Sequence, residues 1–146
     1  MGKYYLAYGS NLSNVHMARC CPDAVPVGRG VLRGYRLTFR VHATIEKCEG
    51  CTVPVGIWEI SHTDENHLDW YEGFPNYYHK ETIPVMLEPF DGSPAREISA
   101  MAYIMNDGHP AAPPTVGYMD CIRRGYACFG LDARTLREAL AFSLAV

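Results

Sequence analysis

The sequence has little excess charge and no long hydrophobic run, and both absences exclude classes of protein. Its 13 Lys and Arg residues against 16 Asp and Glu residues give a net charge of −3 at pH 7, which excludes the basic surface of a nucleic-acid-binding domain. No segment approaches the roughly 20 apolar residues of a membrane span, and the first residues lack the apolar core of a signal peptide. With 20% charged and 48% hydrophobic residues, the composition is that of a globular protein. We expect one soluble, cytoplasmic domain over residues 1–146, with neither a nucleic-acid nor a membrane partner.

Several motifs of enzyme chemistry are also missing. There is no Gly-x-x-x-x-Gly-Lys-Ser/Thr loop for a nucleotide phosphate. There is no Gly-x-Ser-x-Gly elbow, and Ser10 has no identifiable His partner for a catalytic triad. The six His residues are scattered, and His62 and His67 are five apart, so they do not share a helix face as a metal pair does. We expect no metal site and no cofactor.

The six cysteines leave one question open. Cys48-Glu49-Gly50-Cys51 has the spacing of a redox or metal motif, but a zinc site needs a second pair, for which the adjacent Cys20 and Cys21 are poorly spaced. A cytoplasmic chain of this length does not need disulfides for stability. We therefore expect Cys48 and Cys51 to be reduced thiols in a turn, with a redox role as the open alternative.

What the sequence does have is an excess of tyrosine and a clear alternation of strand and helix signals. The ten Tyr residues combine a large apolar ring with a polar tip, which suits the wall of a cavity as well as a core. Alternating apolar residues and turn signals predict strands within residues 3–8, 24–41, 53–60, 78–90 and 97–105. Capping residues and Gly or Pro stops predict helices over residues 14–20, 61–72, 115–128 and from 133 onward. The pattern is that of a β-rich domain with a few short helices.

Glu72 is in conflict with its local structure, because it ends the helix predicted over residues 61–72. The negative end of the helix dipole disfavours a carboxylate there by about 0.3–1 kcal/mol and favours a raised pKa. The neighbouring aromatic residues Trp70, Tyr71, Phe74 and Tyr77 are expected to add desolvation. A raised pKa suits a general base; the alternative is an exposed Glu that tolerates the dipole.

The segment Tyr8-Gly9-Ser10-Asn11 leads from a strand through a glycine turn into a helix. Such a loop can direct consecutive backbone N–H groups at an anion. The alternative is a plain turn in which Gly and Asn adopt the conformations that other residues avoid.

Taken together, these segments resemble the gamma-glutamylcyclotransferase superfamily. The N-terminal Tyr5–Leu12 is similar to the opening signature of that family. Leu68-Asp69-Trp70-Tyr71-Glu72-Gly73, followed by Tyr77-Tyr78, is similar to its Leu-Asp-x-x-Glu-Gly segment with a downstream Tyr. Further similar segments are Val55–Trp58, Tyr103–Met105 and Ala112–Tyr118. The resemblance covers most of the chain in order and is loosest between Asp23 and Cys51.

The resemblance implies an α+β fold, a small mixed β-barrel with flanking short helices and a cavity at one side. It implies Glu72 as the catalytic residue, no metal, no cofactor, and a substrate-binding set of Ala7, Tyr8, Gly9, Ser10, Asn11 and Tyr118; Tyr78 is a further candidate for the pocket wall. The implied reaction converts a γ-glutamyl amino acid or amine, a small-molecule substrate, to 5-oxoproline and a free amine.

Two alternatives remain within this resemblance. One is a γ-glutamylamine cyclotransferase that acts on γ-glutamyl-lysine or another amine, and the other is a non-catalytic ligand-binding protein on the same fold. The sequence also leaves open whether the chain forms a homodimer.

Overall fold

The computed structural model describes residues 2–145, and its centre is a closed barrel of five strands in the order β1-β3-β2-β4-β5. The strands are β1 (Lys3–Ala7), β2 (Val25–Arg40), β3 (His42–Ile60), β4 (Tyr78–Pro89) and β5 (Arg96–Met105). The barrel is mixed, because β1 pairs in parallel with β5 at Tyr5 and Met101 while its pairing with β3 is antiparallel. The expected α+β fold with a small mixed barrel is confirmed.

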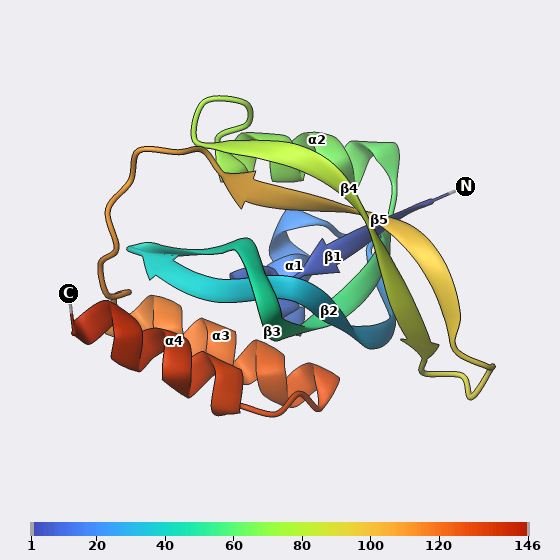
Figure 1. Cartoon of the computed structure of the whole chain (residues 1–146). Coiled ribbons are helices and arrows are strands. Elements are labelled where there is room, and N and C mark those ends of the chain that lie inside the picture. The colour runs from blue at the N-terminus through green and yellow to red at the C-terminus, as the bar shows by residue number, and fades with distance from the viewer. Residues whose placement is uncertain (1, 146) are drawn as a thin grey trace.

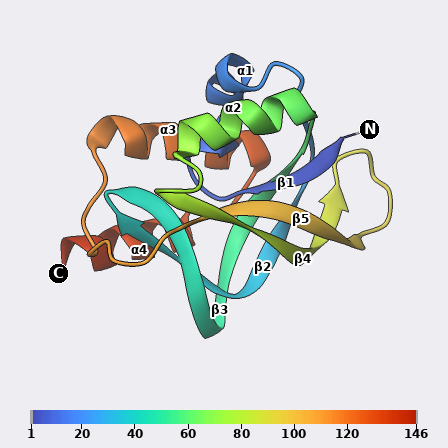
Figure 2. The same ribbon diagram turned by 90° about the horizontal axis from the view of Figure 1, so that it is seen from above.

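Four α-helices flank the barrel and one short 3-10 helix connects β1 to the first of them (Figures 1 and 2). They are η1 (Ser10–Leu12), α1 (Asn14–Cys20), α2 (His62–Glu72), α3 (Val116–Phe129) and α4 (Arg134–Leu144). In Figure 2, α1, α2 and α3 gather on one side of the strands, with α4 beside the end of α3. Within residues 2–145, none of the helices combines the length and the apolar character needed to cross a membrane.

Helix α1 begins at the predicted residue, Asn14, and α2, α3 and α4 each begin one residue later than predicted, at His62, Val116 and Arg134. Ser13 Oγ accepts the N–H of His16 at the start of α1, and Ser61 and Asp64 form a reciprocal capping box at the start of α2. At α4, Asp132 Oδ1 accepts the N–H of Arg134 at 2.9 Å, so the helix starts one residue later than residue 133.

The hairpin of β2 and β3 differs from the sequence prediction, because β3 begins at His42 and not near Val53. Leu37 pairs with Ile45 and brings the earlier part of β3 into the ladder. The Cys48–Cys51 segment lies where the register shifts, as an irregularity within the strand, and the two cysteines form a disulfide with Cα atoms 5.5 Å apart. The expectation of reduced thiols is therefore wrong: the bulge brings both Cα atoms within the range that a disulfide requires.

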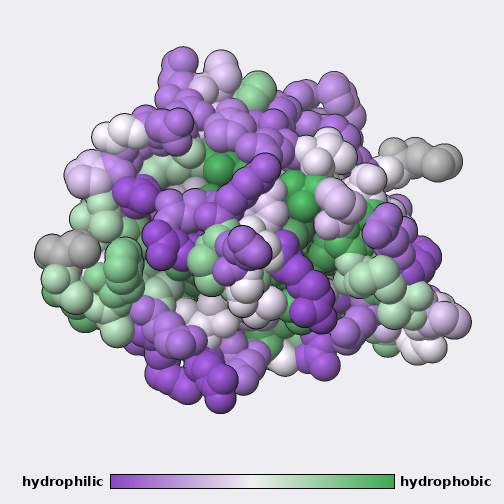
Figure 3. Space-filling view, in the orientation of Figure 1, coloured by the Kyte–Doolittle hydropathy of each residue, from purple (hydrophilic) through white to green (hydrophobic). Residues whose placement is uncertain are grey.

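The surface is mostly hydrophilic on the face shown in Figure 3, with a hydrophobic patch beside the C-terminal end of the chain. Two large apolar side chains near the end of α4, Phe142 and Leu144, are exposed. The interior is formed by the inward residues of the five strands together with residues of the helices. It includes five tyrosines, Tyr5, Tyr8, Tyr78, Tyr103 and Tyr126, and four more are partly buried against it: Tyr4, Tyr35, Tyr77 and Tyr118.

A close contact between α3 and the end of η1 fixes the loop after β1. A Cβ atom placed on Gly125 of α3 would lie 2.4 Å from the Cβ of Leu12 and 2.8 Å from the amide nitrogen of Ser13. Only glycine permits this approach of the two backbones. The segment from Tyr8 to Leu12 is therefore held between the barrel and α3.

Candidate active site

Glu72 is the last residue of α2, and its side chain turns toward the loop after β1. Its Oε1 accepts a hydrogen bond of 3.1 Å from Nδ2 of Asn11. Burial raises the pKa of Glu72 to about 7, and the bond from Asn11 offsets part of this shift. A raised pKa is the direction that the sequence predicted, and Glu72 lines a cavity instead of pointing into solvent.

Burial is the main cause of the shift, and backbone hydrogen bonds weaken the helix dipole at this end of α2. Gly73 adopts a left-handed conformation with φ of 68°, and its N–H donates to the carbonyl of Trp70 at 3.2 Å. The N–H of Phe74 donates to the carbonyl of Asp69 at 2.9 Å. These bonds occupy terminal carbonyls of α2, which weakens the negative end of the helix that Glu72 meets.

The loop after β1 forms the single 3-10 turn η1, with Ser10 and Asn11 both buried. The N–H of Leu12 donates to the carbonyl of Gly9 at 3.0 Å, and Nε1 of Trp58 donates to the carbonyl of Asn11 at 2.9 Å. The N–H groups of Ser10 and Asn11 have no hydrogen-bond acceptor in the part of the chain that the structure describes. Two buried donors without a partner are suited to hold an anionic or carbonyl oxygen of a ligand.

The loop and Glu72 meet at a cavity with two adjoining parts. The inner chamber, about 20 Å³, is lined by Tyr5, Tyr8, Gly9, Ser10, Asn11, Ala43, Glu72, Tyr78, Tyr103 and Tyr118. The outer chamber, about 200 Å³, is lined by Ser10, His42, Tyr71, Glu72, Tyr77, Tyr78 and Tyr118. Glu72 faces both chambers, so its carboxyl group lies at the boundary between a narrow space beside the loop and a wider aromatic space.

The structure brings together the site residues that the sequence predicted, except Ala7. Ala7 is buried in β1 opposite Gly56 and lines neither chamber. Of the aromatic residues expected to desolvate Glu72, Tyr71 and Tyr77 line the outer chamber, whereas Trp70 is 85% exposed and Phe74 lines neither chamber. Sequence reasoning missed His42, Ala43 and Tyr103; for Tyr103, its aromatic character within a strand of the resembling segments was the one available signal.

The tyrosine hydroxyl groups differ in what they can offer a ligand. Those of Tyr8 and Tyr78 donate to the carbonyls of Tyr103 and Ala43, at 2.5 and 2.7 Å. The hydroxyl oxygen of Tyr118 accepts the N–H of Ala43 at 3.0 Å. Because its oxygen is the acceptor there, the hydrogen of Tyr118 stays available to donate. Tyr78 therefore serves as part of the wall, whereas Tyr118 can also donate to a ligand.

An ion-pair network behind the cavity holds α2 against β4 and β5. The hydroxyl of Tyr103 donates to Asp69 Oδ1 at 2.5 Å, and Nζ of Lys80 donates to Asp69 Oδ2 at 3.1 Å and to Glu65 Oε2 at 2.9 Å. Asp69 is one turn before Glu72, on the same side of the helix. The network therefore fixes the helix turn that carries Glu72.

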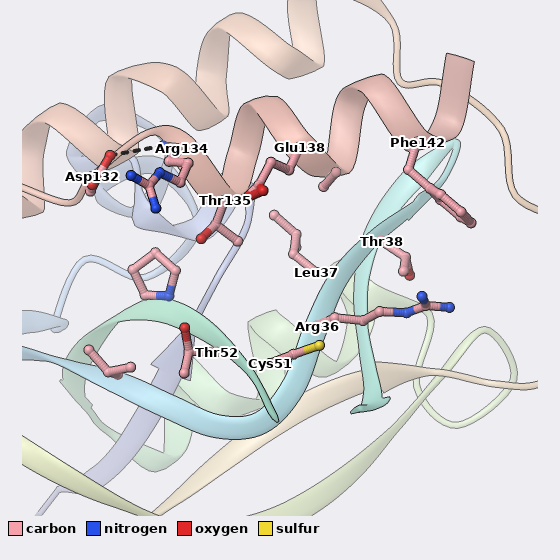
Figure 4. A pocket seen from close by; sticks show the side chains of 13 residues that line it. Arg36, Leu37, Thr38, Cys51, Thr52, Asp132, Arg134, Thr135, Glu138 and Phe142 are labelled. Atoms are coloured by element: carbon pink, nitrogen blue, oxygen red, sulfur yellow. Dashed lines mark hydrogen bonds between the residues drawn. The ribbon is translucent and has the colours of Figure 1, made fainter. Parts of the chain in front are cut away.

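A larger groove, of about 530 Å³, lies between α4 and the β2–β3 hairpin, away from Glu72 (Figure 4). Two of its four charged side chains bond to neighbours: Arg36 pairs with Glu46, and Asp132 accepts the backbone N–H of Arg134. None of the predicted site residues lines it, so we place the candidate site in the smaller cavity. Residues 2–145 contain no group of three or more His, Cys, Asp or Glu arranged to hold a metal ion.

Comparison with known proteins bears on the family and the fold. Residues 5–120 match the family described as gamma-glutamyl cyclotransferase, AIG2-like. A solved structure named gamma-glutamyl cyclotransferase is 26% identical, with a TM-score of 0.78 over 95% of this chain and 86% of that one. The uncharacterized protein loc79017 from Homo sapiens is 25% identical, with a TM-score of 0.77 over 94% and 86%. YkqA from Bacillus subtilis shares the fold at 22% identity, with a TM-score of 0.78 over 99% of this chain and 55% of its own. No curated protein sequence matches significantly.

Proposed function

Because the chain belongs to the gamma-glutamyl cyclotransferase, AIG2-like family, we propose that it converts a γ-glutamyl compound to 5-oxoproline and a free amine, with Glu72 as general acid and base. The observation that carries the proposal is the position of Glu72. A carboxyl group with a pKa of about 7 lies beside two unpaired backbone donors in an aromatic cavity. A base with a pKa near the working pH is the most effective proton carrier.

The reaction needs no nucleophile from the protein, because the substrate carries its own. The α-amine attacks the γ-carbonyl carbon and closes a five-membered ring, and the bond from that carbon to the leaving nitrogen breaks. Folding the substrate so that these atoms approach each other can supply roughly 7–11 kcal/mol in well-aligned cases. The aromatic rings around Glu72, fixed by hydrogen bonds, suit this task.

Glu72 moves the protons. As a carboxylate it takes a proton from the α-ammonium group, which frees the amine to attack, and it returns the proton to the leaving nitrogen. Its position on the wall of both chambers suits this role. Asn11 holds Oε1 of Glu72, which leaves Oε2 for proton transfer.

The loop binds the part of the substrate that does not react. We assign the N–H groups of Ser10 and Asn11 to the α-carboxylate, because an unreacted substrate has to be oriented first; the alternative is the oxyanion that develops on the γ-carbonyl. The hydroxyl of Tyr118 is a further donor in the inner chamber.

A substrate panel tests the proposal. The purified protein is incubated with several γ-glutamyl dipeptides and with γ-glutamyl-lysine, and 5-oxoproline is measured. We expect 5-oxoproline from at least one member. If none is converted, and the same compounds bind in a calorimetric titration, the chain is a ligand-binding protein on this fold and not an enzyme.

A further inference from the structure

Asn106, the residue after the end of β5, bonds to three consecutive carbonyl groups of the loop between α2 and β4. Its Nδ2 donates to the carbonyls of Pro75 at 2.8 Å and Asn76 at 2.9 Å, and its backbone N–H donates to that of Tyr77 at 2.9 Å. The loop follows Glu72 directly and lies beside the end of β5 (Figure 1). Asn106 therefore ties β5 to the segment that leads from Glu72 to Tyr77.

Both ends of this loop reach the cavity. The carbonyl of Gly73, the residue after Glu72, accepts the N–H of Tyr77 at 2.8 Å. The ring of Tyr77 lines the outer chamber together with Glu72, and its hydroxyl lies 3.0 Å from Nδ1 of His42. The position of the loop backbone therefore sets where the Tyr77 ring lies and constrains the end of α2.

The side-chain amide of Asn106 is oriented by His79. Carbonyl oxygens only accept hydrogen bonds, so the NH2 group of Asn106 faces the loop and uses both of its hydrogens there. Its Oδ1 lies 2.8 Å from Nδ1 of His79 and accepts the hydrogen of that nitrogen. Nε2 of the same ring lies 2.8 Å from a carboxylate oxygen of Glu81, which also accepts. These partners assign a hydrogen to each ring nitrogen, so His79 is an imidazolium in this arrangement.

The surroundings of His79 favour the imidazolium. The bonds to Glu81 and Asn106 raise the pKa of His79 against the smaller opposing effect of burial, and the charge of Asp107 adds to the increase. The groove beside His79 is also lined by the titratable residues Tyr35, Arg40, Glu46, Lys47 and His109. When His79 loses a proton, one ring nitrogen faces an acceptor without a hydrogen, so the bond to Glu81 or the bond to Asn106 is lost.

On the premise of the proposed function, we propose that Asn106 and His79 are positioning residues for the reaction. His79 orients the amide of Asn106, and Asn106 holds the loop that connects Glu72 with the wall of the outer chamber. Neither residue lines either chamber, so both act through the loop and not on the substrate. The active form therefore needs a protonated His79 and an ionised Glu72, which makes the pH profile of kcat/KM bell-shaped.

The titration of Glu72 in the ligand-free protein tests the role of Asn106 without a substrate. Carbon-13 NMR of the carboxyl group gives the pKa of Glu72 in the wild type and in Asn106→Ala. We expect the pKa to move from about 7 toward the ordinary 4.5, because a displaced loop lets water reach the carboxyl group. Asn106→Asp keeps the side-chain volume, loses both donors and is expected to act in the same way. If the pKa of Glu72 keeps its wild-type value in the folded variants, the proposal is overturned.

The pH profile of kcat/KM tests the role of His79. His79→Asn keeps a donor for Oδ1 of Asn106 and does not titrate, so we expect the fall at high pH to disappear. Glu81→Gln removes the carboxylate that stabilises the imidazolium, so the fall is expected to begin at lower pH. His62→Gln, at an exposed His on the first turn of α2, is the control and should keep the wild-type profile. A wild-type profile without a fall, or a fall that persists in His79→Asn, overturns the role of His79.

The two proposals fail separately. If the wild type forms 5-oxoproline, we expect kcat/KM of Asn106→Ala at pH 7 to be lower by about tenfold, and an unchanged value overturns the positioning role alone. If the wild type forms no 5-oxoproline from any γ-glutamyl compound, the proposed function is overturned. The NMR titration of Glu72 in Asn106→Ala and His79→Ala then decides the positioning role, since both variants are expected to lower the pKa of Glu72.

Discussion

The side-chain amide of Asn11 bonds to the carboxylate of Glu72 at 3.1 Å, across 61 residues of sequence. The same Nδ2 atom lies 2.7 Å from the hydroxyl of Tyr5. This contact links the loop after β1 to the end of α2, and it connects the two segments that carry the family resemblance. It also lowers the pKa of Glu72 against the larger opposing effect of burial, so Asn11 is a positioning residue for the proposed base.

The pKa of Glu72 predicts how activity depends on pH. A general base has to be ionised, so kcat/KM should rise with pH through about 7. Asn11→Ala removes the donor that favours the carboxylate, and the rising limb is expected to move to higher pH. Tyr5→Phe serves as the control, because it keeps the bond from Asn11 to Glu72 and should shift the limb less. If kcat/KM of Asn11→Ala rises at the same pH as that of the wild type, the bond from Asn11 does not lower the pKa of Glu72.

The raised pKa of Glu72 also predicts that the free energy of unfolding depends on pH. The folded protein holds the proton on Glu72 up to about pH 7, whereas the ordinary value is 4.5, so the free energy of unfolding falls as pH rises between these values. Glu72→Gln removes this loss. Because the residue is partly accessible, we expect the variant to exceed the wild type by about 1–3 kcal/mol at pH 8, and by much less at pH 4. Urea unfolding at both pH values measures the difference; equal differences at both would contradict burial of the charge.

The contact between α3 and the loop predicts opposite effects at two glycines of one helix. Gly125→Ala places a Cβ atom 2.4 Å from that of Leu12, and we expect a loss of about 1–3 kcal/mol in unfolding free energy together with lower activity. Nothing lies within 4 Å of a Cβ on Gly117, so Gly117→Ala should stabilise the helix by up to about 1 kcal/mol. Thermal unfolding and kcat/KM are measured for both variants; equal stability of the two would mean that the close approach is not required.

Gly9 is expected to tolerate little side-chain volume. A Cβ atom there would lie 3.2 Å from that of Ala43 and 3.6 Å from the hydroxyl of Tyr118, both on the wall of the inner chamber. Gly9→Val should therefore raise KM more than it lowers stability, since the added methyl groups occupy the space of the substrate. Steady-state kinetics alongside thermal unfolding separates the two effects, and unchanged kinetics would show that the loop only serves the fold.

The sequence predicted the bounds of helices closely where capping residues next to the helix set them. The bounds of α1 and α2 follow from Ser13, Ser61 and Gly73, whose capping roles depend on neighbours in the sequence. The start of β3 at His42 was missed because it depends on pairing with β2, and so was the disulfide of Cys48 and Cys51.

The sequence predicted the site residues that lie within a recognisable motif. It did not predict the cavity residues that come from strands distant in the sequence. Residues two apart in a strand share a face, so Ala7 lies on the side of β1 that carries Tyr5, but its single methyl group does not line the cavity that Tyr5 and Tyr8 line. Residues two apart on a helix face different directions, so Trp70 is exposed whereas Glu72 lines the cavity. His42 comes from β3 and Tyr103 from β5, and only the closed barrel brings them beside Glu72.

The most direct test of the central claim compares Glu72→Gln with the wild type on the γ-glutamyl substrate that gives the highest rate. Gln keeps the shape of the side chain and removes its ability to carry a proton, and circular dichroism with thermal unfolding checks that the variant is folded. The account predicts that 5-oxoproline formation falls by a factor of at least about 100 while substrate binding persists. A folded Glu72→Gln protein that produces 5-oxoproline at the wild-type rate would contradict it.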